Sequence, residues 1–140
     1  MIRRFEDLEV WQLARELAKR VYAAAQRQKL RHDRGLTDQM QRAAVSVGSN
    51  IAEGFEYGSR KQHIEACYRA KASAGELRSQ VIAATDAGLI DDPVYEDLHG
   101  RCEQCSRMLA AYVRRLELSQ TSFPGVKVAR AASTRTSARE

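Results

Sequence analysis

Apolar side chains recur every three or four residues along four long stretches of this chain, and this period constrains the fold more than any other feature. The stretches cover about residues 8–29, 37–53, 59–87 and 93–118. Such spacing places apolar side chains on one face of an α-helix, where they can pack against another helix. With only 8 glycines, 2 prolines and 6% aromatic residues, the chain has little material for a β-sandwich. The sequence therefore predicts an all-α protein.

The expected helix ends coincide with residues that cap or stop helices. The expected N-caps are Asp7, Thr37 and Ser59. The expected stops are Gly35, Gly54 and Gly88, and Pro93 suits the first turn of the last helix. Connections of about 5 to 8 residues favour helices that alternate in direction. We therefore predict an antiparallel up-down four-helix bundle over residues 1–118.

The last 22 residues differ in composition from the rest of the chain. Residues 119–140 are rich in Ser, Thr, Ala and Arg and show no apolar period. We expect this basic tail to be disordered in the free protein. No apolar run is long enough for a membrane span or a signal peptide, and three cysteines are an odd number for a disulfide framework. These features predict a cytoplasmic location.

Positive charge is concentrated in one segment rather than spread over the chain. The formal charge is +5 overall, and residues 15–34 alone carry seven Lys or Arg against two acids, whereas residues 91–118 sum to −2. A basic patch can bind nucleic acid by releasing counterions from its phosphates. The alternative is a solvated helix face, in part because cations at a helix C-terminus suit its dipole. The candidate phosphate-binding residues are Arg15, Lys19, Arg20, Arg27, Lys29, Arg31 and Arg34.

The sequence Cys102-Glu103-Gln104-Cys105 has the spacing of a redox or metal motif. A thioredoxin-like thiol pair begins a helix after a strand, whereas this pair lies within an expected helix. His63 and Cys67 also have ligand spacing, but in an antiparallel bundle Cys67 lies about 20 Å along the axis from Cys102, too far for one zinc ion. We interpret all three cysteines as core residues and expect no catalytic residue, metal or cofactor.

A polar stripe runs beside the apolar face of the second expected helix. It contains Ser46, Asn50 and Glu53, and the third helix adds Ser73 and Glu76. One interpretation is structural: these groups hydrogen-bond one another or cap the end of the second helix, and so fix the register of the two helices. The other is a contact surface for a partner chain or a nucleic-acid backbone.

The segment from Gln39 to Gly54, with its Ser-x-x-x-Asn-Ile-Ala-Glu-Gly motif, resembles the signature of a known family. The family comprises four-helix-bundle proteins found in intervening sequences of bacterial large-subunit ribosomal RNA genes. Three further matches are Phe5-x-x-Leu8-x-x-Trp11, Ser73-Ala74-Gly75-Glu76-Leu77 and Gly88-Leu89-Ile90. The resemblance covers about residues 5–118. Gly48 departs from it, because many members carry proline there, and the tail lies outside it.

The resemblance implies assembly into a homopentameric ring. A related branch includes the accessory variability determinant of diversity-generating retroelements, which works with a reverse transcriptase and its template RNA. Five copies of a +5 chain would create a strong circular field. Apolar residues outside the predicted seams either contact other subunits or widen the core; they are Leu13, Leu17, Ile64, Ile82, Met108 and Val113.

These observations predict a non-enzymatic, homopentameric scaffold or accessory protein that binds nucleic acid through backbone phosphates. We expect the nucleic acid to be RNA. The alternative is a protein-interaction module that docks a partner enzyme, such as a reverse transcriptase, without itself binding nucleic acid. The dependence of binding on salt distinguishes the two functions, because binding to phosphates weakens steeply as ionic strength rises.

Overall fold

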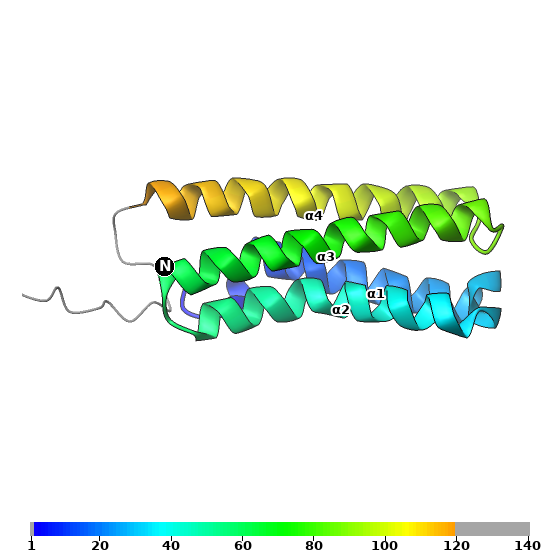
Figure 1. The fold of residues 1–140 in the computed structure, drawn as a ribbon, viewed down its shortest axis with the longest axis horizontal. Coiled ribbons are helices and arrows are strands. Elements are labelled where there is room, and N and C mark those ends of the chain that lie inside the picture. Colours follow the sequence, from blue (N-terminus) through cyan, green and yellow to red (C-terminus); the bar gives the residue numbers. More distant parts are fainter. Residues whose placement is uncertain (1, 120–140) are drawn as a thin grey trace, which may run out of the picture.

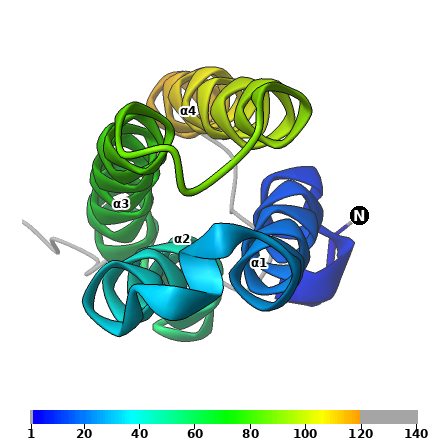
Figure 2. The same cartoon turned by 90° about the vertical axis from the view of Figure 1, so that its right-hand side faces the viewer.

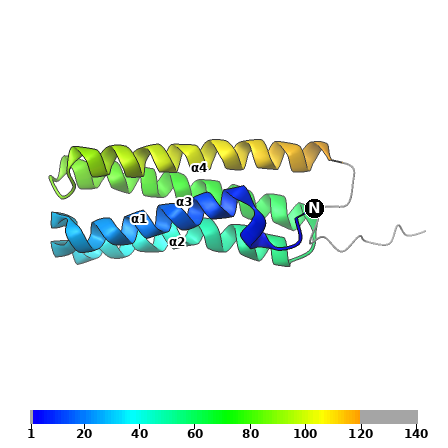
Figure 3. The same cartoon turned by 180° about the vertical axis from the view of Figure 1, so that it is seen from behind.

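The computed structural model describes residues 2–119, and all regular structure in this range is helical. The elements are the short 3-10 helices η1 (Phe5–Asp7) and η2 (Lys29–His32) and the α-helices α1 (Glu9–Arg27), α2 (Arg34–Glu56), α3 (Arg60–Asp86) and α4 (Asp92–Leu118). The four α-helices lie side by side and successive ones run in opposite directions (Figures 1 and 3). Four helices and no strand within residues 2–119 confirm the all-α prediction. Apart from Ser119, the predicted tail lies outside the described residues.

Viewed end-on, the helices follow one another around a common core (Figure 2). The α1–α2 and α3–α4 connections therefore meet at one end of the bundle, which we call the turn end. Three hydrogen bonds join these connections, and in one of them Gln28 Nε2 donates to Asp91 Oδ2 over 3.4 Å. The Leu30 amide donates to the Leu89 carbonyl over 2.9 Å, and the Asp91 amide donates to Gln28 Oε1 over 3.1 Å.

The predicted apolar seams form the core. Val21, Val47, Ile51 and Leu77 are fully buried, and Cys67, Cys102 and Cys105 are buried as expected of core residues. Among the apolar residues outside the predicted seams, Leu17 and Val113 are buried and three pack partly against the core: Leu13, Ile64 and Met108. Only Ile82 of this group is largely exposed, at 41%. These residues therefore mostly widen the core. No helix within residues 2–119 is long and apolar enough to cross a membrane.

The ends of the first two helices differ from the prediction. Helix α1 is capped by Leu8 without a side-chain bond, because Asp7 lies in η1. Helix α2 begins at Arg34, and its N-cap is Asp33, whose Oδ1 accepts from the Leu36 amide over 3.0 Å. The expected cap, Thr37, instead donates its hydroxyl to the Leu30 carbonyl over 2.8 Å. Since Asp and Thr are both good caps, the sequence alone did not separate them.

The second helix also runs further than predicted, because Gly54 does not end it. Helix α2 continues to Glu56, and Gly54 lies inside it, facing α3. A Cβ at this position would overlap the Cβ of Ala66 and lie 3.2 Å from the Cα of His63. Gly54 thus allows α2 and α3 to approach closely, and its role is steric rather than that of a helix stop.

The later boundaries agree with the prediction. Ser59 Oγ accepts from the Gln62 amide over 3.4 Å at the start of α3. Gly88 follows α3 with a φ of 70°, a conformation that glycine adopts without strain. Pro93 stands in the first turn of α4, where Asp91 Oδ1 accepts from the Val94 amide over 3.0 Å.

Candidate nucleic-acid interface

The seven candidate basic residues do not form one continuous surface. Arg15 lies against α1's own Trp11, with its guanidinium carbon 5.8 Å from the ring centre. Three others line the groove between α1 and α4: Lys19, Arg20 and Arg27. The remaining three lie at the turn end, in η2 or at the start of α2: Lys29, Arg31 and Arg34.

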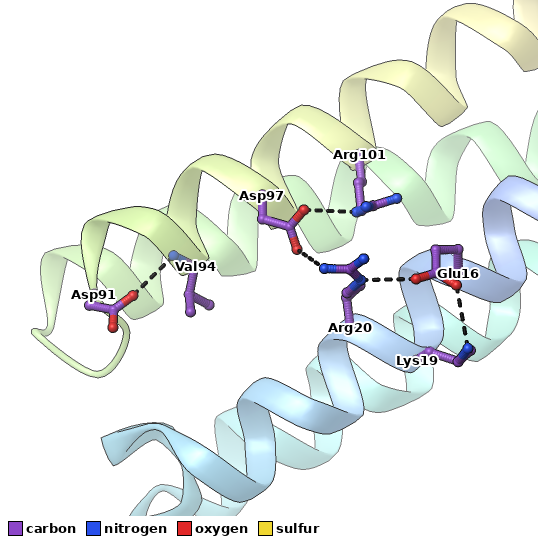
Figure 4. Close-up of polar contacts among 7 residues, drawn as sticks. All are labelled: Glu16, Lys19, Arg20, Asp91, Val94, Asp97 and Arg101. Carbon is purple, nitrogen blue, oxygen red and sulfur yellow. Dashed lines mark hydrogen bonds and ion pairs between the residues drawn. The ribbon is translucent and has the colours of Figure 1, made fainter.

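Carboxylates already hold two of the candidate cations. Glu16 pairs with Arg20 over 2.9 Å and with Lys19 over 3.5 Å (Figure 4). Arg20 also reaches across to Asp97 of α4 over 3.6 Å, and Asp97 binds Arg101 over 2.8 Å. The Arg20 hydrogen bond, and then the charge of Lys19, lower the pKa of Glu16 below its ordinary value. Lys19 and Arg20 are thus partly neutralised, and Arg20 joins α1 to α4.

Four candidate cations are exposed at or near the turn end: Arg27, Lys29, Arg31 and Arg34. None of them forms an ion pair with another residue of the 2–119 range. The same end also holds four carboxylates: Asp33, Asp86, Asp91 and Asp92. Two of these, Asp33 and Asp91, are engaged in capping helices. The local field is therefore weaker than the charge of residues 15–34 suggests, although the cations themselves stay open to a ligand.

The polar stripe joins α2 to α3 through a short chain of hydrogen bonds. Asn50 Nδ2 donates to the Ser46 carbonyl over 2.8 Å and to Ser46 Oγ over 3.0 Å. The Ser46 and Ser73 hydroxyls are 2.9 Å apart, and Arg69 Nε donates to Asn50 Oδ1 over 3.3 Å. All three of Ser46, Asn50 and Ser73 are partly buried. The geometry favours the interpretation that they hold the register of α2 against α3.

The other two residues of the stripe lie apart from this chain of hydrogen bonds. Glu53 is exposed and lines a shallow groove on α2, together with Asn50 and Arg42. Glu76 accepts a hydrogen bond from Gln80, one turn further along α3, over 3.2 Å. The spacing of the stripe thus identified the contacting residues on α2 but not which acids would join them.

A buried polar cluster joins α3 to α4, and from sequence spacing two of its members, His63 and Cys67, resemble only a pair of metal ligands. His63 is fully buried, and its Nε2 lies 2.8 Å from the Tyr112 hydroxyl and 3.9 Å from Cys67 Sγ. Burial lowers the pKa of His63 to about 4, against a smaller opposing effect of a backbone hydrogen bond with Gly54. The ring is therefore neutral at physiological pH and ties α3 to α4 and α2.

Burial also governs the three thiols. It raises the pKa of Cys67 and Cys102 to about 12 and that of Cys105 to about 11. A thiol is nucleophilic as its thiolate, so these cysteines are poor nucleophiles near neutral pH. Among residues 2–119 there is no cluster of three or more His, Cys, Asp or Glu side chains suited to a metal ion.

A second basic groove, between α3 and α4, was not predicted from the sequence. Its lining includes Lys71 from α3, and Arg107, Arg114 and Glu117 from α4. The summed charge of −2 for residues 91–118 does not indicate this groove, because the acids cluster in the first half of α4 and arginines predominate in the second half. The antiparallel register brings that second half beside the first half of α3 (Figure 1). Summing charge over facing helices, rather than along the chain, would have found it.

Comparisons with known proteins agree with the fold. A family model described as 23S rRNA-intervening sequence protein matches residues 6–111. The chain is similar in structure to a crystal structure of a protein of unknown function from the S23 ribosomal protein family of Bacteroides thetaiotaomicron. The TM-score is 0.68 at 20% identity, covering 75% of this chain and 98% of that one. No curated protein matches the chain.

Proposed function

The chain belongs to the family of 23S rRNA-intervening sequence proteins, and from that premise we propose that it is a non-enzymatic, homo-oligomeric protein that binds nucleic acid. The ligand we propose is RNA, held through its backbone phosphates. The assembly we propose is a pentameric ring, in which each subunit presents the same turn end. Closed rings of identical subunits repeat one surface by symmetry, so a modest patch on one chain becomes an extended one.

One observation carries this proposal: the exposed cations of the turn end have no ion-pair partner among residues 2–119. Cations that no carboxylate holds can exchange water and mobile ions for phosphates, and the counterions released from the nucleic acid drive binding. Lys19 and Arg20 contribute less, because Glu16 and Asp97 already hold them. We therefore assign the main phosphate contacts to Arg27, Lys29, Arg31 and Arg34.

The test is a triple variant of the turn end, Arg27→Gln, Lys29→Gln and Arg31→Gln, titrated with labelled RNA at several salt concentrations. For a single strand, the slope of log K against log salt should fall by about 0.7 for every phosphate that a cation no longer neutralises. The triple variant should therefore bind more weakly, and its slope should be smaller by about 2.

The matched control removes three cations from elsewhere on the surface: Arg3→Gln, Arg4→Gln and Arg42→Gln. Arg4 and Arg42 lie in exposed pairs with Glu6 and Asp38, and Arg3 is exposed. The control should retain most of the affinity for RNA. Its net charge falls by as much as that of the turn-end variant, but its turn end is intact. Equal effects of both variants, or no effect of either, would remove the turn end from the interface.

The second candidate function is a docking module that binds a partner enzyme without nucleic acid. A mostly apolar groove between α1 and α2 favours it. Trp11, Ala18, Val45 and Gly48 line this groove, and the Val45 side chain is 45% exposed. Binding through such a surface would respond little to salt between low and physiological ionic strength, which separates the two functions in the same titration.

A further inference from the structure

The α3–α4 groove combines positive charge with an exposed aromatic ring. It has a volume of about 540 Å³, and three cations line it for one carboxylate, a formal charge of +2. The α1–α4 groove carries +1, with both of its carboxylates engaged in ion pairs, and the groove on α2 carries −1. Of these three grooves, the α3–α4 groove therefore has the electrostatic potential that is most favourable for an anion.

Most of this charge is available to a ligand. Lys71 and Arg114 form no ion pair within residues 2–119. Arg107 lies 3.8 Å from Glu103, but its side chain is 70% exposed, so the pair is worth little in water. The groove's own carboxylate, Glu117, accepts a hydrogen bond from the Tyr68 hydroxyl over 3.1 Å. Glu117 is thus occupied by the tyrosine rather than by a cation.

Tyr68 provides an aromatic surface beside these cations. It is 53% exposed, and the bond to Glu117 fixes the hydroxyl end of its ring at the edge of the groove. Ala110 and Ala111 are small groove-lining residues, so a planar group can approach the ring closely. Cations that follow a backbone, combined with an aromatic ring on which a base can stack, are typical of single-strand binding sites.

The spacing of the arginines also suits a short strand. Arg107 and Arg114 are two turns apart on α4, about 10 Å along its axis. One stacked strand advances about 3.4 Å per nucleotide, so this distance corresponds to about three nucleotides. A duplex pairs its bases inside the helix and offers none to stack on a side chain, whereas an unpaired strand does.

We propose that the α3–α4 groove binds single-stranded nucleic acid, with phosphates on Lys71, Arg107 and Arg114 and an unpaired base stacked on Tyr68. This inference rests on the proposed function in requiring a nucleic-acid partner, but it uses residues distinct from the turn end. The groove would favour an unpaired strand over a duplex, whereas the turn end alone does not distinguish the two.

The test measures binding of the full chain to labelled oligo(U) and oligo(dT) of about 12 nucleotides, a length within the range of single-strand sites. A duplex of the same length is the third probe. Tyr68→Ala should weaken single-strand binding at least about fivefold, the lower limit for one stacked base. Tyr68→Phe keeps the ring but loses the hydrogen bond to Glu117, so it should bind more tightly than Tyr68→Ala. Lys71→Gln with Arg107→Gln and Arg114→Gln should reduce the salt slope by about 2.

The outcomes separate this inference from the proposed function. Loss of binding in the turn-end variant with unchanged binding in the groove variants would overturn the groove and leave the proposed function standing. Equal affinity for duplex and single strand, or equal affinity of Tyr68→Ala and Tyr68→Phe, would overturn the single-strand assignment. An original protein that binds none of the three probes would contradict the proposed function itself. Tighter binding of oligo(dT) than of oligo(U) would contradict RNA as the proposed ligand, whereas tighter binding of oligo(U) would support it.

Discussion

Gly54 illustrates how one residue type serves two purposes that a sequence does not distinguish. Glycine commonly ends helices, and that interpretation placed a connection after residue 53. In the structure Gly54 lies inside α2, where only a hydrogen atom fits between the helix and Ala66. The motif Asn50-Ile51-Ala52-Glu53-Gly54 is therefore a packing motif: Asn50 bonds along and across the helices, Ile51 fills the core and Gly54 permits contact.

We predict that Gly54→Ala destabilises the protein by about 1–3 kcal/mol, the usual effect of forcing an extra methyl group into a tight contact. Chemical denaturation followed by circular dichroism measures it. Gly75→Ala is the matched control, because a Cβ there has no atom within 4 Å. The control should be neutral or stabilise α3 by up to about 1 kcal/mol, since alanine favours helices. Equal stability of the two variants would show that α2 and α3 are not in close contact at Gly54.

The buried His63 should make stability depend on pH. Its pKa is about 4 in the folded protein and 6.5 in an exposed chain, so between these values only the unfolded chain binds the proton. The stability that neutral His63 gives the folded protein, measured as the free energy of unfolding, is fully present above pH 6.5 and is lost as the pH falls towards 4. Between pH 7.5 and 5 the loss should be about 2 kcal/mol, at 1.36 kcal/mol per pKa unit.

Urea unfolding at both pH values, for the original protein and for His63→Gln, isolates this effect. The glutamine variant does not titrate, so its stability should fall less over the same interval, whatever its absolute stability. The same pH dependence in both proteins would show that the His63 ring is accessible to protons in the folded state.

At the scale of the helices, the sequence predicts well how many helices form and in which direction each runs. It predicts poorly how neighbouring helices align along the bundle axis. Each apolar seam is a local pattern, so the four α-helices and the buried cysteines followed from spacing. The contacts of Arg20 with Asp97, and of Tyr68 with Glu117, join residues that are far apart in the chain. They depend on how α1 and α3 align with α4, which is set by caps and close packing. For this reason the ion pairing of Lys19 and Arg20, and the whole α3–α4 groove, were not foreseen.

The hydrogen bonds between α2 and α3 give a prediction at this scale. Asn50→Ala removes the hydrogen bonds that Asn50 donates to Ser46 and accepts from Arg69, and should cost about 1–3 kcal/mol, because each such bond contributes about 0.5–1.5 kcal/mol. Nucleic-acid binding should persist in the folded variant. Ser49→Ala, at an exposed position on the same helix, is the control and should have little effect. An unchanged melting temperature with abolished binding would instead make Asn50 a contact residue.

At the scale of the whole molecule, the two basic surfaces lie towards opposite ends of the bundle. The α1–α2 and α3–α4 connections form one end of the bundle, and the start of α3 and the end of α4 lie at the other (Figure 1). Arg27, Lys29 and Arg31 belong to the turn end, whereas the α3–α4 groove lies in the half towards the opposite end. Acids between them, such as Glu16 and Asp97, keep the middle of the α1–α4 face close to neutral. In a ring, this arrangement would repeat two separate cationic zones around the assembly, which suits a long strand better than a compact ligand.

Native mass spectrometry of the purified protein, recorded before and after nuclease treatment, tests the central claim most directly. We predict a pentamer that carries additional mass, and the nuclease should remove that mass while leaving five subunits together. A pentamer without nuclease-sensitive mass would favour the docking module. A monomer with no bound nucleic acid would contradict both the assembly and the function proposed for this chain.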